Sequence, residues 1–555
     1  MSNNIKRTFG GIEAKTMSII IDRLTDVVRR FPDKPAFTYG DDNGFHHIPY
    51  RLFYQAAAGV AADLATRGCR PGDRIALLAD YTPNWCAAYM GIHGAGCTVI
   101  PLDAQHSKAE VDNIIGFVNP VAAFTDAAHR SLLPDGIDLI DVAGLYESAT
   151  GDAVFPAVDL PRDAPMSIIF TSGTTGDPKG VMLTPGNFMS NVSGLQGYRG
   201  LVLEGDVVLA ILPLHHVYGF TCTFLAPVLI GCTAVFPRSI AGPDIAEALV
   251  ETGVTLLVGV PQVLTLFYRK IYDAVEGGSF LVRRIFSLLR TITRLSRKYL
   301  GINPGRLLFA KVHRNFPRLR YITSGGARLE PEVFHGLSDV GFLIIEAYGL
   351  TETSPIACLN DPKRPVAGSV GKPMEGVRIR IDIPEGGFEQ GEDCIKGPNV
   401  MSGYFQRKEA TEKAIVNGWF HSGDLGYLDP DGRLFLTGRK KEVIVLPSGK
   451  NVYPEELENL YAGSHRIQEV CVIALGKKGR EKLTAAVHPN MDYFRRMKAG
   501  NIFQDIKYDI ETMAGRLPSY QRITRIEIID RELPRTRLGK LKRFQIMEMI
   551  ESREN

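Results

Sequence analysis

Short apolar runs recur along roughly the first 360 residues of the chain, separated by longer segments of mixed polarity, and this alternation most constrains the fold. The runs are RIALLAD, CTVIPLD, VAAFTD, MSIIFTS, TLLVGV and LRYITSGG. Runs of this length are typical of buried strands, whereas segments such as IIIDRLTDVVRRF have the spacing of amphipathic helices. Strands that alternate with helices predict an α/β fold.

The sequence changes character between about residues 365 and 437. It becomes rich in glycine and turn residues, as in GKPMEGVRIRIDIPEGGFEQGED, which predicts antiparallel strands or a small barrel. A charged turn, GRKKEV, then leads into another helix, so a new unit is predicted to begin near Gly438. Because 555 residues are too many for one core, we predict a large N-terminal domain, 1–437, of α/β subdomains with a barrel-like part, and a small α+β domain, 438–555.

The segment IIFTSGTTGDPKGVMLTP, residues 168–185, has the composition of an anion-binding loop. Glycines let backbone amides turn toward a ligand, and hydroxyls and a lysine add donors. The spacing excludes a Walker loop, in which four residues separate the first glycine from Gly-Lys-Ser/Thr. The segment after Lys179 also has extended rather than helical character. We therefore predict a loop between two strands that folds over a polyphosphate, with Ser172, Thr174, Thr175 and Lys179 as donors.

Cysteine usage and hydropathy indicate the compartment. The eight cysteines form no CxxC pair, which favours a reducing compartment and argues against structural zinc, and the first residues lack the apolar core of a signal peptide. Residues 207–237 carry no charge, but three prolines and the pair His215-His216 interrupt them. This pattern favours a buried strand, a loop, a helix and another strand over a membrane span. We expect a cytoplasmic protein.

One segment is strongly basic. Residues 283–320 contain eleven Lys or Arg and no Asp or Glu, and an apolar stripe runs through a helix in this region, comprising Leu281, Ile285, Leu288, Leu289, Ile292, Leu295 and Tyr299. Two interpretations are open. The stripe could dock on the protein's own domain and leave a solvated cationic face, or the helix could form a peripheral contact with an anionic membrane. Nucleic acid is disfavoured, because no recognisable binding fold accompanies the charge.

Five further segments follow the Gly-rich loop in order: LPLHHVYG (212–219), TSGGA (323–327), YGLTET (348–353), FHSGDLGYLD (420–429) with GRKKEV (438–443), and PRTRLGKLKR (534–543). With the loop they resemble the adenylate-forming superfamily of acyl-CoA synthetases, peptide-synthetase adenylation domains and luciferases. The basic insertion before TSGGA is similar to that of long-chain fatty acyl-CoA synthetases. The resemblance covers nearly the whole chain. It implies an AMP-binding N-terminal domain, a mobile C-terminal domain, and a two-step reaction through acyl-AMP that uses ATP, Mg²⁺ and coenzyme A.

The resemblance implies roles for the residues around the phosphates. The Gly-rich loop, from Thr171 to Gly180, would offset the charge of the pyrophosphate leaving group. Thr351 would contact a phosphate oxygen, and Glu352 would supply the hard oxygen ligand that Mg²⁺ prefers. Lys540 would bridge the substrate carboxylate and the α-phosphate, because a compact ammonium attracts both anions. The catalytic residues predicted in this way are Lys540, Glu352, Lys179 and Thr351, with Glu352 as the metal ligand.

Other positions would hold the nucleoside. Gly325 and Gly326 would let the backbone lie flat against adenine, with Tyr348 on its other face. Asp424 would accept both ribose hydroxyls, and Arg439 would add a donor. The full predicted nucleotide set is Thr171, Ser172, Gly173, Thr174, Thr175, Gly176, Lys179, Gly325, Gly326, Ala327, Tyr348, Gly349, Thr351, Asp424, Arg439 and Lys540.

The acid and the domain motion are predicted from the same resemblance. His216 corresponds to a histidine at the acyl-binding entrance of the family, and His215 stands where many members have the aromatic ring of the gating pair. The predicted substrate contacts are His216, Tyr218, Gly219 and Gly326, the predicted hinge is Lys441, where many members carry Asp, and the predicted thiolation loop lies around Gly449.

These observations predict a fatty acid–CoA ligase of the AMP-forming type, acting on a medium- to long-chain acid. An acyl carrier protein as acceptor, and adenylation of another carboxylic acid, remain alternatives. A peripheral membrane protein without catalysis is the alternative of another class.

Overall fold

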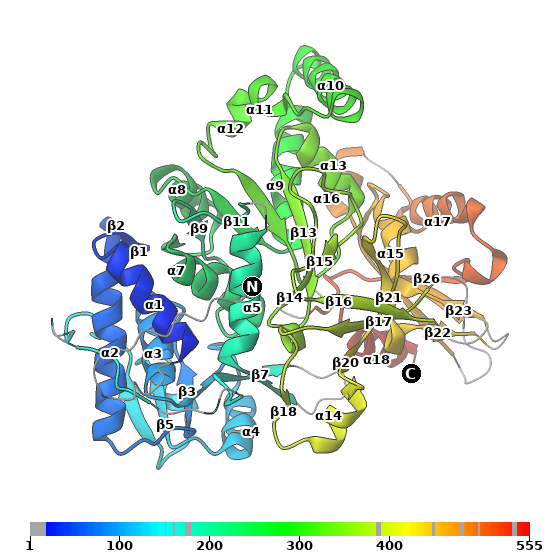
Figure 1. The fold of residues 1–555 in the computed structure, drawn as a ribbon. Coiled ribbons are helices and arrows are strands. Elements are labelled where there is room, and N and C mark those ends of the chain that lie inside the picture. Colours follow the sequence, from blue (N-terminus) through cyan, green and yellow to red (C-terminus); the bar gives the residue numbers. More distant parts are fainter. Residues whose placement is uncertain are drawn as a thin grey trace.

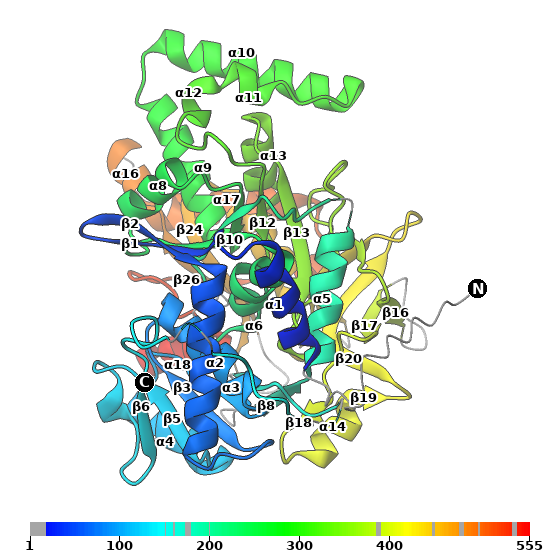
Figure 2. The same ribbon diagram turned by 60° about the vertical axis from the view of Figure 1, so that its left-hand side comes forward.

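The structure is a computed structural model that describes residues 18–149, 151, 153–158, 161, 163–171, 179–198, 200–383, 390–446, 450–476, 482–497, 500–535 and 541–554. Figures 1 and 2 show an extended N-terminal part and a smaller C-terminal part packed beside it. The predicted fold class is confirmed: a large α/β unit with a curled antiparallel sheet precedes a small α+β unit. The predicted boundary at Gly438 falls within strand β21 and stays a prediction.

Two mixed sheets form the α/β part, and the predicted runs are strands in them. The seven-stranded sheet has the order β18 (Gly403–Tyr404), β8 (Lys179–Leu183), β7 (Ser167–Thr171), β4 (Thr98–Pro101), β3 (Arg74–Leu78), β5 (Ala122–Thr125), β6 (Asp138–Asp141). The nine-stranded sheet has the order β15 (Lys372–Pro373), β14 (Ile356–Leu359), β13 (Ile344–Gly349), β12 (Tyr321–Ser324), β11 (Leu256–Gly259), β9 (Val207–Leu209), β10 (Thr233–Phe236), β1 (Pro35–Asp41), β2 (Gly44–Pro49).

Helices with few polar residues fill the space between these sheets. α2 (Tyr50–Thr66) packs on α3 (Pro83–Gly94), which is buried at nearly every position. The ring of Trp85 stacks on Tyr89 at 5.3 Å between centroids, and Tyr89 lies 4.4 Å from Phe220 of the π-helical segment η2 (Phe220–Leu225). Stacking of this kind adds to the burial of large rings. These ring contacts connect α3 to η2.

The uncharged stretch 207–237 has the predicted organisation. It begins with β9, continues through a loop into α6 (Val217–Gly219), η2 and α7 (Ala226–Ile230), and ends in β10. Proline and glycine at its turns fit this division. None of the helices in the described ranges is both long and apolar enough to cross a bilayer.

The Gly-rich segment past residue 365 forms the predicted antiparallel sheet. Its order is β16 (Arg378–Asp382), β17 (Gly391–Lys396), β20 (Trp419–Leu428), β19 (Ile415–Val416), with β21 (Leu434–Arg439) also paired to β20. The C-terminal unit packs α15 (Pro454–Ala462), α17 (Ile502–Met513) and α18 (Arg543–Glu554) on β24 (Ile467–Leu475), β25 (Lys482–Pro489) and β26 (Arg525–Ile528).

Candidate active site

The Gly-rich loop connects the two strands predicted for it. β7 and β8 pair antiparallel, with Thr171 opposite Lys179, so the loop leaves and returns at the end of one hairpin. Residues 172–178, which include the predicted donors Ser172, Gly173, Thr174, Thr175 and Gly176, lie outside the described residues. Lys179 begins β8, and its Nζ lies 5.0 Å from the centroid of the Tyr404 ring on the neighbouring strand β18.

The same tyrosine holds the predicted metal ligand. The Tyr404 hydroxyl donates to Oε1 of Glu352 at 2.8 Å, so one side chain connects Lys179 with Glu352. Glu352 lies in a short 3-10 turn, Thr351–Thr353, and its backbone oxygen accepts from the Met401 amide at 2.9 Å. A carboxylate oxygen is the hard ligand that Mg²⁺ prefers, and the Lys179 ammonium over the ring of the same tyrosine suits a polyphosphate. These residues therefore fit the implied metal.

Tyr348, Asp424 and Arg439 form a second cluster, as expected for a nucleoside site. The Tyr348 hydroxyl donates to Oδ2 of Asp424 at 2.8 Å, and Nε of Arg439 lies 2.9 Å from Oδ1. The sheet enforces the ion pair, because Asp424 of β20 lies opposite Arg439 of β21. Burial raises the pKa of Tyr348 well above its ordinary value, so its hydroxyl remains a donor. The Asp424 carboxylate is buried and has further acceptor capacity.

The backbone at TSGGA requires its glycines. A Cβ at Gly325 would lie 2.8 Å from Cζ of the Tyr218 ring, and Gly326 has φ +83°. The Tyr218 hydroxyl lies 3.1 Å from Oγ1 of Thr323, which fixes the ring against the glycine. Ala327 follows as an exposed residue. Only glycine therefore fits at 325 against the ring, and the half-exposed backbone of Gly326 would suit a flat base.

His215 and His216 differ sharply in their partners. His215 is buried, bonds the Tyr81 hydroxyl through Nδ1, and places Nε2 3.3 Å from Oδ2 of Asp103. The two imidazole centroids are 3.9 Å apart. Nε2 of His216 is buried and finds no hydrogen-bond partner among the described residues. Both ring nitrogens of His215 therefore have protein partners, as expected for a structural histidine. His216 keeps Nε2 available for a ligand.

Burial lowers the pKa of His216 to about 4, with the charge of His106 adding to the effect. Since the unfolded histidine titrates near 6.5, only the unfolded state takes up a proton between these values, and stability falls as pH falls from about 6.5 to 4. The expected loss between pH 7 and pH 5 is about 2 kcal/mol from this group alone. Urea unfolding at both pH values should show a smaller loss for His216→Gln. The exposed His465→Gln is the control, and an equal pH dependence in both variants would contradict the assignment.

The C-terminal motif falls largely outside the described residues, which omit 536–540 and therefore Lys540. Its flanks nevertheless lie near the N-terminal domain. Desolvation raises the pKa of Glu330, and the charges of Arg269 and Arg535 oppose the shift. Hydrogen bonds from Ser107 lower the pKa of Glu110, and Lys542 contributes a smaller part. Gly449, the centre of the predicted thiolation loop, is also outside the described residues.

The predicted hinge residue lies between two anchored neighbours. Lys440 pairs with Glu392 of β17 at 2.8 Å, and Glu442 pairs with Arg543 of α18 at 2.9 Å. Lys441 is exposed between them in a 3-10 turn. One neighbour is thus tied to the N-terminal domain and the other to the C-terminal domain.

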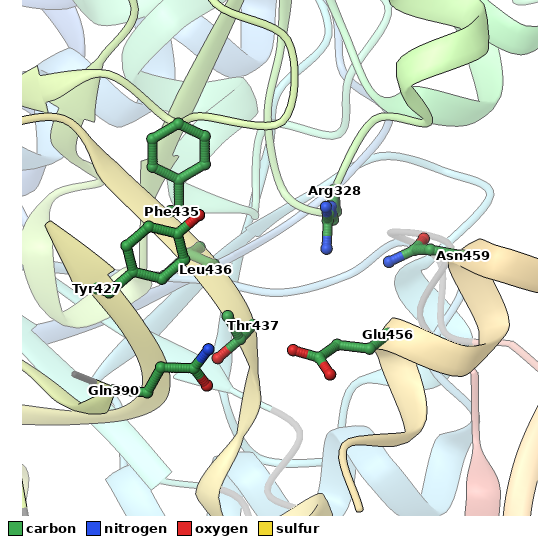
Figure 3. Close-up of a pocket in the computed structure, with 8 residues that line it drawn as sticks. All are labelled: Arg328, Gln390, Tyr427, Phe435, Leu436, Thr437, Glu456 and Asn459. Atoms are coloured by element: carbon green, nitrogen blue, oxygen red, sulfur yellow. The ribbon is translucent and has the colours of Figure 1, made fainter. Parts of the chain in front are cut away.

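A narrow apolar cavity lies behind Tyr218. It encloses about 40 Å³ between the nine-stranded sheet and the helices α5 (Pro185–Gly197), η2 and α7. Its lining is Leu195, Leu201, Val202, Val208, Tyr218, Cys222, Ala226, Pro227, Leu256, Val258, Tyr321, Thr323, Ala347, Ile356 and Leu359. A larger cavity of about 310 Å³ lies between the two domains, where Arg328 and Gln390 face Glu456 and Asn459 of α15 (Figure 3). None of the predicted site residues lines the larger cavity.

Comparison with known proteins agrees with this geometry. The AMP-binding enzyme family matches residues 24–405, and its C-terminal domain matches residues 441–553. The chain belongs to the AMP-binding enzymes. It is 32% identical over 464 residues to the long-chain-fatty-acid–CoA ligase FadD15 of Mycobacterium bovis, covering 75% of this chain and 74% of that protein. It is 29% identical to the indoleacetate–CoA ligase of Aromatoleum aromaticum over 548 residues, covering 94% and 96%.

A solved structure has the same fold. The o-succinylbenzoate coenzyme A synthetase MenE of Bacillus subtilis, in complex with ATP and magnesium, superposes with a TM-score of 0.73 at 24% identity, covering 95% of this chain and 99% of that one. The present chain is therefore an ATP-dependent acid–thiol ligase of the acyl-CoA synthetase type, with coenzyme A as co-substrate. In the MenE complex, magnesium accompanies ATP. The predicted family membership is confirmed.

Sequence patterns gave no signal for several residues of this site. Tyr404 belongs to a two-residue strand and contacts Glu352 only because β18 pairs with β8. Asp393 is buried beside Tyr348, and burial raises its pKa to about 7, with Asp424 and Glu392 adding to the shift. Asp103 was not distinguishable from an ordinary strand-end carboxylate, although it holds His215. Only contacts across the sheets identify these positions.

Proposed function

We propose that this AMP-binding enzyme ligates a medium- to long-chain fatty acid to coenzyme A. The observation that carries the proposal is the apolar cavity behind Tyr218. Its lining side chains are hydrocarbon or sulfur apart from those of Tyr218, Tyr321 and Thr323, and no Asp, Glu, Lys, Arg or His is among them. Such a lining suits an alkyl tail and offers no partner for a second carboxylate.

The cavity as it stands is small. About 40 Å³ is close to the share of one water molecule, ~30 Å³, so an acyl chain enters only if the lining side chains separate. The lining extends along α5, η2 and α7 on one side and five strands on the other, which gives a seam longer than the free volume. An acyl tail that separates these helices from the strands leaves water for apolar contacts. Because this gain grows with the apolar area buried, it favours longer chains.

In the first half-reaction an oxygen of the fatty acid carboxylate attacks the α-phosphorus of ATP, the bond to the β-phosphate oxygen breaks, and acyl-AMP and pyrophosphate form. We assign Lys179, with the loop from Thr171, to the charge that develops on pyrophosphate. Glu352 would hold Mg²⁺, which neutralises phosphate charge when it is bound. Lys540 would draw the carboxylate and the α-phosphate together.

In the second half-reaction the coenzyme A thiol gives up its proton and attacks the acyl carbonyl, and AMP leaves. We propose that the C-terminal domain pivots at Lys441 between the half-reactions, removing Lys540 and presenting the loop around Gly449. The ion pairs of Lys440 and Glu442 support this role. Because each neighbour is held by a different domain, a rotation between the domains would change the backbone dihedral angles mainly at Lys441. The residues around Tyr348 and Asp424 would keep the nucleoside in place throughout.

The proposed substrate also suggests where in the cell the enzyme acts. A long-chain acid partitions into bilayers, so we propose a cytoplasmic enzyme that associates peripherally with membranes and acts on small molecules, without nucleic acid as a partner. The basic segment from Arg283 to Arg320 is the part of the chain that suggests this contact.

A variant that fills the cavity tests the proposed substrate. Cys222 lines the cavity, and Cys222→Phe should reduce kcat/KM for long-chain acids about tenfold or more while leaving a short acid nearly unaffected, because only a long tail needs the occupied volume. The measurement is acid-dependent AMP formation with coenzyme A across short, long and aromatic acids. An equal effect on all acids, or preference of the unmodified enzyme for an aromatic acid, would remove the fatty-acid assignment.

The rival acceptor and the non-catalytic alternative are tested with the same preparation. Acyl carrier protein in place of coenzyme A should give no thioester. Acid-dependent exchange between ATP and pyrophosphate should be readily detected, and its absence would favour a protein without catalysis.

A further inference from the structure

Helix α10 (Phe280–Leu295) presents its apolar stripe to solvent. Along the stripe the exposed fractions are 66% for Leu281, 48% for Ile285, 62% for Leu288, 41% for Ile292 and 48% for Leu295. They follow one helical face, and α10 lies at the outer edge of the molecule in both views (Figures 1 and 2). Contiguous exposed apolar surface of this kind marks an interaction site.

The apolar surface continues beyond the helix. Tyr299 is 71% exposed, Leu300 69% and Ile302 58%, and Leu307 of α11 (Gly305–Leu308) is 82% exposed. A short turn after α10 therefore extends the patch. We call the stripe of α10 together with these residues the α10 patch.

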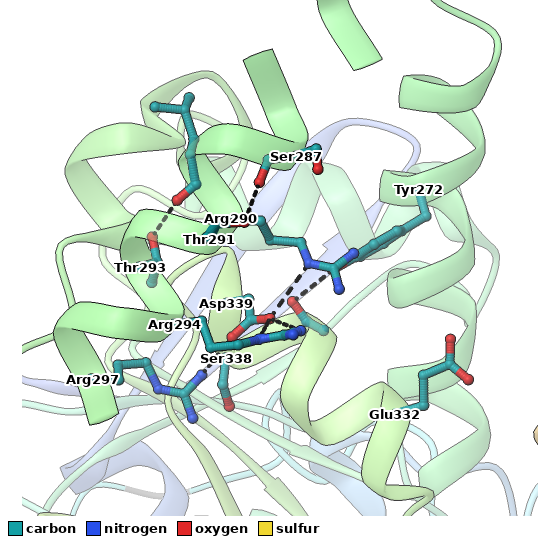
Figure 4. A network of polar contacts seen from close by, with 12 residues as sticks. Tyr272, Ser287, Arg290, Thr291, Thr293, Arg294, Arg297, Glu332, Ser338 and Asp339 are labelled. Atoms are coloured by element: carbon teal, nitrogen blue, oxygen red, sulfur yellow. Dashed lines mark hydrogen bonds and ion pairs between the residues drawn. The ribbon is translucent and has the colours of Figure 1, made fainter. Parts of the chain in front are cut away.

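The opposite face of α10 is fixed by one buried carboxylate. Asp339, at the end of α13 (Pro331–Asp339), is 1% exposed, and three guanidinium groups of α10 and the turn after it converge on it (Figure 4). The distances to its oxygens are 3.4 Å from Arg290, 2.8 Å from Arg294 and 3.0 Å from Arg297. Rotating the helix to bury the stripe would leave this carboxylate buried without a charged partner, which is costly.

This arrangement reverses the docked interpretation of the sequence. In that interpretation the apolar stripe packs on the domain and the cations face water. In the structure the guanidinium groups of Arg290, Arg294 and Arg297 reach Asp339 of the domain, and Leu289 packs on the domain core. The other leucines and isoleucines of the stripe are exposed. Asp339 balances one of these three positive charges, and the stripe residues form the exposed apolar feature.

Cations that form no ion pair with any described residue flank the patch. Arg284 lies over the Phe280 ring at 5.1 Å, and Lys298 lies over the Tyr299 ring at 5.3 Å. Arg283 is exposed at the start of the helix. No Asp or Glu occurs from 280 to 320. An apolar stripe bordered by long basic side chains complements an apolar layer covered by anionic groups.

We propose that the α10 patch binds the interfacial region of a bilayer that contains anionic phospholipids. The leucines and isoleucines of the stripe lie at the acyl boundary, Tyr299 lies at headgroup level, and Arg284 and Lys298 extend to the phosphates. Charge complementarity favours this occupant over a second copy of the chain, because two such patches would bring like charges together. The advantage of the contact rests on the proposed fatty-acid substrate, whereas its geometry does not.

The test uses the full-length protein and vesicles of phosphatidylcholine with and without phosphatidylglycerol. Wild type should co-sediment with the anionic vesicles. The triple variant Leu281→Gln, Leu288→Gln, Leu295→Gln should bind at least about tenfold more weakly, and Arg284→Gln, Lys298→Gln should lose mainly the dependence on phosphatidylglycerol and salt. Because all three leucines are exposed, the fold should be retained. The matched control Ile240→Gln, at a residue 76% exposed elsewhere, should bind like wild type.

Several outcomes would overturn the proposal. These are no sedimentation of wild type with anionic vesicles, unchanged binding by the triple variant, and concentration-dependent dimers that the triple variant abolishes without any vesicle binding. Activity on a water-soluble medium-chain acid, measured without vesicles, separates this proposal from the previous one. If the enzyme were active on the acid but did not bind vesicles, only the proposed membrane contact would be contradicted. If it bound vesicles but had no activity on fatty acids, only the proposed substrate would be contradicted.

Discussion

Replacement of Lys540 by alanine is expected to slow acyl-AMP formation about a hundredfold to a thousandfold, and to leave thioester formation from supplied acyl-AMP nearly unchanged. The loss has the size seen when one charge-stabilising donor is removed from a site that excludes water. Its selectivity has a simple cause. The ammonium is needed while two anions approach each other, and that approach is complete once acyl-AMP exists. Pyrophosphate exchange and single-turnover thioester formation measure the two steps separately.

The neighbouring Lys542 supplies the matched control for this experiment. It carries the same charge in the same motif and is exposed, and its charge acts weakly on Glu110. Lys542→Ala should therefore keep most of the adenylation rate. If Lys540→Ala impaired both half-reactions equally, or if both alanine variants behaved alike, the assignment of Lys540 to the first step would be wrong.

The change Glu352→Gln is expected to reduce kcat/KM for MgATP about a hundredfold. A glutamine keeps the shape and can still accept from Tyr404, but it lacks the anionic oxygen that Mg²⁺ prefers, and about 3 kcal/mol of metal-dependent stabilisation corresponds to this factor. The variant should also need more Mg²⁺ for half-maximal rate. Calorimetric titration with ATP, with and without Mg²⁺, gives a readout independent of turnover.

Two further variants locate the effect at the carboxylate. Tyr404→Phe removes the hydrogen bond to Glu352 but keeps the ring over which Lys179 lies, so a smaller loss of about tenfold is expected. Glu409→Gln changes an exposed acid on α14 (Lys408–Ala414) and should have no effect. An unchanged Mg²⁺ requirement in Glu352→Gln would exclude Glu352 as the metal ligand.

Local pattern was sufficient for the fold class and for the hairpin that carries the Gly-rich loop. Strand-forming runs, helix spacing and turn residues act over a few neighbouring positions, so β7, β8, β11 and β12 appear where the sequence predicts them. The ordered motifs were likewise sufficient for the family. Their geometry agrees with the predicted proximity of Tyr348, Asp424 and Arg439, although their roles stay predictions.

Tertiary structure alone decided how distant residues complete the site. Tyr404 connects Lys179 with Glu352 because β18 pairs with β8, and a two-residue strand leaves no periodic signal. The anchoring of His215 by Tyr81 and Asp103 depends in the same way on three segments far apart in the chain. A pairing of this kind is fixed by sheet order, and local propensity does not specify sheet order.

The basic helix shows the same division most clearly. Its amphipathic spacing is a property of the sequence, and the helix was predicted from it. The sequence of the helix does not decide which face turns inward. Hydrophobic burial favours burying the apolar stripe, whereas an ion pair with a buried acid favours turning the arginines inward. Asp339 decides between them, and it lies more than 40 residues beyond the first of its partners, Arg290, on another helix. The chain therefore determined that α10 has two faces, and the position of one carboxylate in the folded domain determined which face remains exposed.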